Sequence, residues 1–166
     1  EEEYAMKKVL VVMGSDSDLK VMEKCVDRLK SFAIPAEVRI CSAHRTPAAA
    51  EQLAKNAAAE GFGVIIAAAG KAAHLGGVLA AYTTLPVIGV PVRSHALSGW
   101  DSLLSIVQMP GGIPVATTAV GNSGATNAGL LAVSILSTTD ERLANALQEY
   151  RDSLKEKVAE SNAQLV

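Results

Sequence analysis

The chain has 166 residues, of which 49% are hydrophobic and only 19% are charged. A chain this long and this apolar buries a substantial core, which excludes a disordered protein. The net charge of −2 leaves no basic surplus to hold a phosphate backbone, so we expect no general nucleic-acid binding. Cys25 and Cys41 lie far apart without metal-ligand spacing, which argues against a disulfide framework or a zinc site and fits the reducing cytoplasm.

Apolar, β-branched runs alternate with helical patterns along the chain. After an acidic tail at 1–6, which we expect to be flexible, strands are predicted at residues 7–13, 36–41, 62–68, 85–90 and 113–119. Helices are predicted at residues 19–32, 46–60, 70–82, from about 101, at 121–137 and at 139–162. This alternation predicts a parallel sheet built of right-handed βαβ units, which bind ligands at the carboxyl ends of their strands. We expect one catalytic domain at 7–138 and a helical arm at 139–166.

The second half of the chain is almost devoid of charge. Residues 102–139 contain no Asp, Glu, Lys or Arg. Polar residues, glycine and proline interrupt every apolar run, so we expect no membrane span, and the acidic first residues are unlike a secretory signal. Because a small monomer rarely exposes so much uncharged surface, we expect other subunits to cover part of it.

The last predicted helix carries an apolar stripe at helical spacing. The stripe consists of Leu143, Leu147, Tyr150, Leu154 and Val158. At 1.5 Å per residue this helix is about 35 Å long, more than a domain of this size readily covers. It either packs on its own domain or lies as an arm across a neighbouring subunit, and its length favours the arm.

The segment from Gly14 to Asp18 links the first strand to a helix. Glycine permits close backbone approach, Ser15 and Ser17 supply hydroxyls, and the helix start presents N–H groups, a combination suited to phosphate or ribose. The alternative is that Ser17 and Asp18 only cap the helix. Neither a GxGxxG nor a GxxxxGK[ST] pattern occurs here, so dinucleotide and P-loop sites have no support.

The segment from Ser42 to Arg45 follows the second strand and precedes a predicted helix start, with Thr46 as its cap and Pro47 in its first turn. His44 is able to donate or accept a proton near neutral pH, and Arg45 is able to clamp a phosphate or carboxylate with two hydrogen bonds. A lone histidine is often structural, but this position after a parallel strand favours a catalytic role.

Residues 67–75 form an apolar segment of small residues that contains Lys71 and His74. It either encloses a dry pocket for a small neutral molecule or serves ordinary helix–strand packing. Residues 121–125 form a further turn at a helix start, for which a plain tight turn is favoured over a functional role. The run 102–110 is typical of core or interface, and the loop with His95 and Trp100 is either a lid or plain exposed chain. Together these patterns indicate a small α/β enzyme that acts on a phosphorylated polar substrate by acid–base chemistry, without metal or covalent nucleophile.

Five ordered motifs resemble the carboxyaminoimidazole ribonucleotide mutase family of purine biosynthesis. They are residues 14–18, 42–47, 72–75, 85–92 and 101–110, within a similarity that runs from about 9 to 136. The resemblance implies a three-layer α/β/α sandwich of flavodoxin-like or Rossmann-like type, a homo-octamer, and a C-terminal helix exchanged with a neighbour. It also implies transfer of a carboxylate from the exocyclic amine to ring carbon 4 of an aminoimidazole ribonucleotide, with no cofactor and no metal.

The resemblance assigns roles to residues by position. His44 is the expected general acid and base, and Arg45 is expected to hold the phosphate. The remaining ribonucleotide contacts are expected at Ser15, Asp18, Ser17 and Ser42. A closed pocket for carbon dioxide, which must be retained between loss and re-addition, is expected at Ala43, Gly70, Ala72, Ala73, His74 and Leu75. Lys71 is expected to contact the substrate beside this pocket.

The chain departs from the family pattern at several positions. The family usually has glycine at Ala68 and Lys71, proline at Gly76, and lysine at His95. A related branch, the aminoimidazole ribonucleotide carboxylases, uses free carbon dioxide and lacks the Ala-Ala-His-Leu segment that this chain keeps at 72–75. We therefore expect a mutase; the alternatives are a carboxylase and a nucleotide-binding homologue without catalysis.

Overall fold

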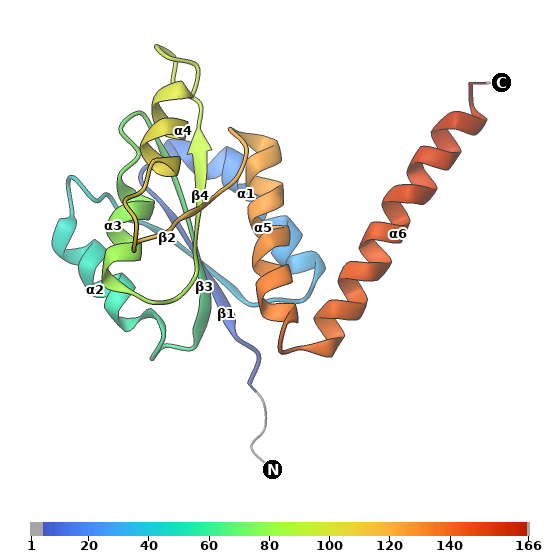
Figure 1. The fold of residues 1–166 in the computed structure, drawn as a ribbon, viewed down its shortest axis with the longest axis horizontal. Helices are drawn as coiled ribbons and strands as arrows, with labels where there is room; N and C mark the ends of the chain where they lie inside the picture. Colours follow the sequence, from blue (N-terminus) through green and yellow to red (C-terminus); the bar gives the residue numbers. More distant parts are fainter. Residues whose placement is uncertain (1–4, 166) are drawn as a thin grey trace.

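The computed structural model describes residues 5–165, and its centre is a five-stranded parallel sheet (Figure 1). The strand order is β2-β1-β3-β4-β5, with every neighbouring pair parallel. The strands are β1 (Lys8–Met13), β2 (Ala36–Ile40), β3 (Phe62–Gly70), β4 (Val87–Val92) and β5 (Ala116–Thr117). Strand β2 lies on one side of β1, and the later strands β3, β4 and β5 are added on its other side. Because all strands are parallel, the loops that follow β1, β2 and β3 meet at one edge of the sheet.

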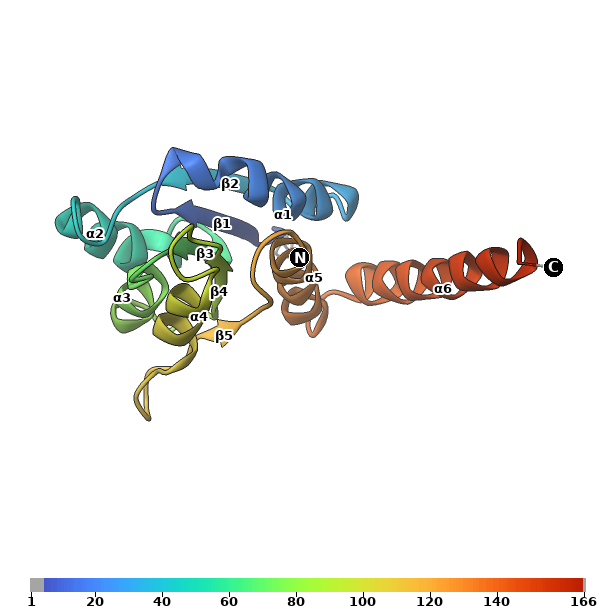
Figure 2. The same ribbon diagram turned by 90° about the horizontal axis from the view of Figure 1, so that it is seen from above.

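Helices cover both faces of the sheet and complete the three layers predicted for this fold (Figure 2). They are α1 (Leu19–Ser31), α2 (Pro47–Ala57), α3 (Leu75–Tyr82), α4 (Trp100–Val107), α5 (Asn122–Ser137) and α6 (Glu141–Ala163). Helices α1 and α5 bury one face of β1, β3 and β4, and α2, α3 and α4 bury the opposite face. The prediction of a flavodoxin-like α/β fold is therefore confirmed.

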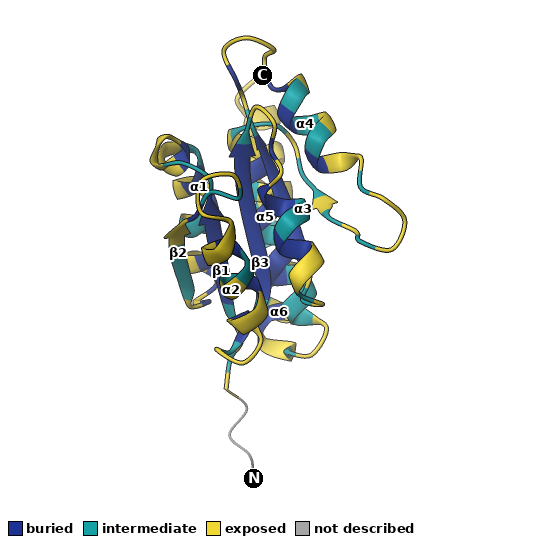
Figure 3. Cartoon of the chain, turned by 90° about the vertical axis from the view of Figure 1, so that its left-hand side faces the viewer, coloured by how far each residue is buried: buried dark blue, intermediate teal, exposed yellow. Residues whose placement is uncertain are grey.

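The central strands are the most apolar because both of their faces are covered. Every residue of β1 after Lys8 is buried, and so are Val64 to Ala69 in β3 (Figure 3). Strand β3 continues two residues beyond the predicted end, and α3 begins only at Leu75 instead of residue 70. The intervening residues form a loop in which Lys71 has a φ of 57°, which interrupts any helix there.

Strand β5 is much shorter than the seven residues predicted for it. Only Ala116 and Thr117 pair with β4. Pro114 has no backbone N–H to donate, which restricts pairing before the strand. Beyond these two residues the chain makes only scattered bonds to β4: the N–H of Thr118 donates to the carbonyl of Gly89 at 3.0 Å, and that of Gly121 to the carbonyl of Pro91 at 2.9 Å.

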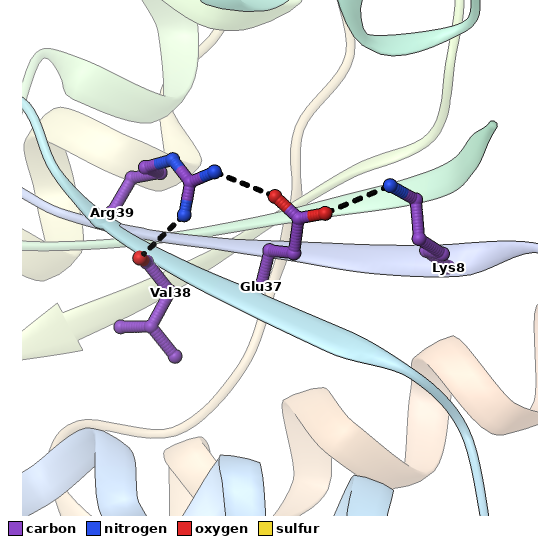
Figure 4. Close-up of polar contacts among 4 residues, drawn as sticks. All are labelled: Lys8, Glu37, Val38 and Arg39. Carbon is purple, nitrogen blue, oxygen red and sulfur yellow. Dashed lines mark hydrogen bonds and ion pairs between the residues drawn. The ribbon is translucent and has the colours of Figure 1, made fainter. Parts of the chain in front are cut away.

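Strand β2 forms the opposite edge of the sheet, and its outer part is polar (Figure 4). Glu37 Oε1 lies 2.8 Å from Lys8 Nζ, and Glu37 Oε2 lies 2.6 Å from Arg39 Nη2. The hydrogen bond from Lys8 is the main cause that lowers the pKa of Glu37. Such exposed ion pairs contribute little stability, but charges on an edge strand discourage pairing with another sheet.

Helix α6 begins on its own domain and then leaves it (Figures 1 and 2). Asp140 caps the helix by accepting the N–H of Leu143, whose side chain is buried. The Tyr150 ring packs edge-on against Phe32, with 5.9 Å between ring centroids. Beyond this contact Leu154 and Val158 are exposed. The first half of the stripe therefore packs on the domain, while the second half remains uncovered in the single chain.

The acidic tail expected at 1–6 falls largely on residues 1–4, which lie outside the described residues. Met6 packs against the core beneath α6, and Arg142 Nη2 lies 3.4 Å from its sulfur. Exchange of α6 with a neighbour remains a prediction.

Candidate active site

A cavity of about 440 Å³ opens at the carboxyl edge of the sheet. The loops after β1, β2, β3 and β4 all contribute to it, as the parallel topology requires. It is lined by Gly14, Ser15, Ser17, Asp18, Ser42, Ala43, His44, Arg45, Ala69, Gly70, Lys71, Ala72, His74, Leu75, Val92, Arg93 and Ser94.

The loop after β1 forms a compact turn that carries the hydroxyls of Ser15 and Ser17. The Gly14 N–H donates to the carbonyl of Ala68 at 3.1 Å, which ties the loop to β3. Ser15 Oγ accepts both the N–H of Ser17, at 3.3 Å, and the Ser17 hydroxyl, at 3.0 Å. The short 3₁₀ turn Asp16–Asp18 follows and leads directly into α1.

Asp18 is a buried carboxyl group in the wall of the cavity, with 6% of the residue exposed. Its side chain makes no capping hydrogen bond to α1, so capping does not explain it. Burial raises the pKa of Asp18; a backbone hydrogen bond at Ser15 opposes this shift, and the charge of Asp16 adds to it. A carboxyl group held out of water in this way is suited to bind hydroxyls of a polar ligand.

The turn after β2 is locked by hydrogen bonds between its two ends. The Thr46 hydroxyl donates to the carbonyl of Ser42 at 2.8 Å and accepts the N–H of Ser42 at 3.1 Å. The N–H of Arg45 donates to Ser42 Oγ at 3.1 Å. Thr46 was expected to cap α2, but its hydroxyl points back into this turn and makes no capping bond. The turn therefore holds His44 and Arg45 in a defined orientation toward the cavity.

His44 and His74, which are 30 residues apart in the sequence, meet in the lining of the cavity. His44 Nε2 lies 2.6 Å from His74 Nδ1, and the ring planes are nearly perpendicular, at 89°. One nitrogen must donate and the other accept, so this contact holds a single hydrogen. The contact uses Nε2 of His44, so the other ring nitrogen of His44, Nδ1, takes no part in it.

The loop after β3 places small residues and one cation on the cavity wall. Lys71 lies at the rim in the left-handed backbone conformation, which is uncommon for residues with a side chain. Ala72, His74 and Leu75 also line the cavity, whereas Ala73 is buried beneath the loop. Ala73 is the only residue of the predicted site that does not line the cavity.

Residues from the end of β4 belong to the cavity although sequence reasoning assigned them no site. Arg93 and Ser94 line it beside Val92. The signal that could have found them is position, because they follow a parallel strand as the other site residues do. The lining contains the cationic residues Arg45, Lys71 and Arg93 but a single acidic residue, Asp18. The formal charge of the cavity therefore favours an anionic ligand. His95 and Trp100 are exposed and stand outside the lining.

The remaining sequence candidates have structural positions away from this cavity. Residues 121–124 open α5, and the run 102–110 forms most of α4 and the loop after it. Within residues 5–165, no three His, Cys, Asp or Glu side chains gather closely enough to hold a metal ion. Among the helices described, none is long and apolar enough to cross a membrane.

A parallel sheet with a cavity at its carboxyl edge that contains histidine, arginine and aspartate places the chain in the class of α/β proteins that bind small molecules at this edge. Residues 8–157 match the family model described as AIR carboxylase, and the chain belongs to this family. The resemblance drawn from the five sequence motifs is therefore confirmed.

Close relatives match over nearly their whole length. A protein of Bacillus subtilis named N5-carboxyaminoimidazole ribonucleotide mutase is 57% identical over 156 residues, covering 94% of this chain and 96% of that protein. A protein of Brucella melitensis with the same name is 57% identical and covers 92% and 94%. Among solved structures, PurE of Treponema denticola superposes with a TM-score of 0.87 at 31% identity, covering 96% of this chain and 98% of that one.

Proposed function

We propose that this chain is an N5-carboxyaminoimidazole ribonucleotide mutase, which moves a carboxylate from the exocyclic nitrogen of the substrate to carbon 4 of its imidazole ring. The observation that carries the proposal is the hydrogen-bonded pair of His44 and His74 at a cavity that also contains Arg45 and Asp18. Relatives that are 57% identical bear this name and support it.

The charges of the cavity suit a ribonucleotide that carries both a phosphate and a carboxylate. Arg45 binds the phosphate, since its planar guanidinium offers two parallel N–H groups to a pair of oxygens. Ser15 and Ser17 add hydroxyls at the same end, and Asp18 accepts a ribose hydroxyl. Ser42 and Ala43 contact the ribonucleotide from the cavity wall beside these residues. Lys71 and Arg93 are the further cations of the lining, available to the carboxylate.

His44 transfers protons in two opposite directions. In the first step the bond between nitrogen and the carboxylate carbon breaks, carbon dioxide is released, and the exocyclic nitrogen takes a proton from His44. In the second step carbon 4 of the electron-rich ring attacks the carbon dioxide and forms the new carbon–carbon bond. His44 then accepts the proton that leaves carbon 4. One imidazole serves both steps because it ends each cycle with the proton it started with.

Carbon dioxide must remain in place between the two steps. It is small and uncharged, so it is held by a close-fitting, largely apolar wall rather than by charge. Ala72, His74 and Leu75 supply this wall, with Gly70 at its base and Ala73 supporting it from below. The short side chains of this loop let its backbone approach the carbon dioxide closely. The proposed reaction uses no cofactor and no metal.

We also propose that the chain functions as a homo-octamer in the cytoplasm, without membrane or nucleic-acid partners. Trp100, Leu104 and Val107 form an exposed apolar stripe on α4, and Leu154 and Val158 form another on α6. Exposed stripes of this kind are typical of subunit interfaces. Residues 7–138 act as the catalytic domain, and residues 139–166 act as an arm on a neighbouring subunit.

The test compares two substrates with the same enzyme. The N-carboxylated ribonucleotide is supplied alone, and separately the uncarboxylated ribonucleotide is supplied with bicarbonate, while the ring-carboxylated product is followed by its absorbance. Efficient turnover of the first substrate supports a mutase. Turnover of the second alone contradicts it and identifies a carboxylase, and tight binding without turnover of either identifies a binding protein.

A further inference from the structure

We propose that Ser105 is a positioning residue of this reaction, because its hydroxyl fixes the loop of small residues that retains carbon dioxide. Ser105 lies on α4, more than thirty residues away in sequence from the loop it contacts. The inference rests on the proposed function for its effect on the reaction, but the hydrogen bond itself is independent of that function.

The Ser105 hydroxyl bridges α4 and the loop. It donates to the carbonyl of Asp101 in its own helix, at 2.7 Å, and it accepts the backbone N–H of Ala73 at 3.0 Å. The carbonyls of Ser102, in α4, and of Lys71, in the loop, also lie near this hydroxyl, at 3.2 Å and 3.4 Å. Because a hydroxyl has one hydrogen and two lone pairs, the short bond to Asp101 turns a lone pair toward Ala73.

Ala73 is the buried member of the loop, so its N–H has little access to water. A buried N–H that loses its acceptor is unfavourable, and the loop is expected to shift until that group is solvated. The next residue is His74, whose Nδ1 contacts His44. A shift of the loop at Ala73 therefore acts on the histidine pair and on the wall of the carbon dioxide pocket together.

Polar side chains of α4 also bind the segment at the end of β4. The Ser94 hydroxyl donates to the Asp101 carboxylate at 2.9 Å, and the Ser102 hydroxyl donates to the carbonyl of Val92 at 2.8 Å. Ser94 and Val92 line the cavity as well. Helix α4 thus holds the two loops that follow β3 and β4, and Ser105 is its contact with the first of them.

The expected consequence is leakage of the intermediate rather than loss of substrate binding. With Ser105→Ala the carbon–nitrogen bond still breaks, but carbon dioxide escapes before carbon 4 attacks it. The uncarboxylated ribonucleotide and bicarbonate then accumulate instead of the ring-carboxylated product. A lost neutral hydrogen bond corresponds to a change of about fivefold, which is the increase expected in the ratio of leaked to completed turnovers.

The experiment uses the full-length protein in its native assembly and three variants. Ser105→Ala removes the hydroxyl, and Ser105→Cys fills nearly the same space with a much weaker hydrogen-bonding group. Ser137→Ala is the matched control, because it removes a serine hydroxyl that bonds a carbonyl three residues earlier, in α5. The uncarboxylated and ring-carboxylated ribonucleotides are quantified after reaction of the N-carboxylated substrate, with the rate of non-enzymatic loss subtracted. Amide hydrogen exchange at Ala73 is measured without ligand.

Support requires that both Ser105 variants raise the leaked fraction and accelerate exchange at Ala73 by about fivefold, with ribonucleotide affinity within about twofold, while Ser137→Ala matches the parent. Unchanged exchange at Ala73 in a folded Ser105 variant overturns the proposal. Faster exchange with unchanged leakage overturns its role in the reaction. If the parent protein itself turns over neither ribonucleotide, the proposed function fails, and the exchange measurement still decides whether Ser105 positions the loop.

Discussion

The proposed chemistry depends on His44 and His74, and each of them lies in a loop that is fixed by hydrogen bonds between backbone groups and a Ser or Thr hydroxyl. The turn closed by Ser42 and Thr46 orients His44, and the loop held by Ser105 orients His74. Their 2.6 Å contact therefore joins two separately fixed loops. This arrangement suits a proton that must be given and recovered in one cycle, because neither ring has to move far.

Substitution of His44 tests its proposed role directly. His44→Asn keeps a polar side chain of similar size but removes the group that exchanges protons, so kcat is expected to fall at least about 100-fold. The dissociation constant of the ribonucleotide is expected to change little, because the phosphate and ribose contacts remain. Steady-state kinetics and calorimetric binding measure the two effects, and near-normal kcat would remove His44 from the mechanism.

Asp18 links the site to the pH dependence of stability. Because burial raises its pKa above the ordinary value of 3.8, the folded state binds this proton more tightly than the unfolded chain does. Stability is therefore lost as the pH rises from the ordinary value through the raised one. Asp18→Asn is expected to raise the thermal midpoint at pH 7, by about 3 °C for each 1 kcal/mol gained, and to weaken ribonucleotide binding.

The stabilising effect of Asp18→Asn is expected to shrink at acidic pH, where the wild-type carboxyl is neutral as well. Thermal unfolding at a series of pH values measures this difference. Asp27→Asn serves as the control because Asp27 is exposed on α1. A midpoint difference that grows toward low pH would contradict the expected sign.

At the scale of elements, backbone contact between segments decides where helices begin. Gly124 lies in the first turn of α5, and a Cβ atom added to it would stand 1.5 Å from the carbonyl oxygen of Ala119. Gly121, just before the helix, has a φ of 82°. The turn at 121–124 is thus a point of close packing between α5 and the chain that follows β5, which the sequence alone presented as an ordinary tight turn.

Gly124→Ala is therefore expected to be strongly destabilising. The atoms that a Cβ would meet belong to backbone and have no alternative rotamer, so the loss is expected to exceed about 3 kcal/mol. Gly111→Ala is the matched control, because nothing lies within 4 Å of a Cβ at that position. Denaturant unfolding measures both variants, and equal stability of the two would show that the start of α5 can shift without penalty.

At the scale of the whole molecule, the single chain leaves apolar surface on two helices. The α4 stripe of Trp100, Leu104 and Val107 is exposed, whereas Asp101 and Ser102 of the same helix form hydrogen bonds with Ser94 and Val92. Helix α6 carries Leu154 and Val158 away from the core. Because α4 also holds the cavity loops, a partner that covers its outer face would stabilise the site.

Charges introduced on the outer half of α6 are expected to disrupt assembly. If the chain forms the proposed octamer, Leu154→Lys with Val158→Lys should convert it to smaller species, because a lysine pair cannot be buried without counter-charges. The control is Asn145→Lys with Gln148→Lys, which adds the same charge elsewhere on the helix. Light scattering at micromolar concentration measures the mass, and an unchanged mass would remove this part of α6 from the interface.

The sequence alone was sufficient for the fold class and for most of the cavity lining. Apolar runs such as residues 7–13 report burial on both faces of a strand, and polar segments directly after strands report the ligand-binding edge. These signals are local, so they survive without knowledge of the fold. The same rule, applied after β4, would have added Arg93 and Ser94.

Tertiary structure alone decided the contacts between segments far apart in the chain. The pairing of His44 with His74, the tie from Ser105 to Ala73, the burial of Ala73 and the two-residue length of β5 all depend on how loops and strands pack against one another. Residue periodicity states which side of an element is buried but not what lies against it, because that is set by strand order and packing across the molecule.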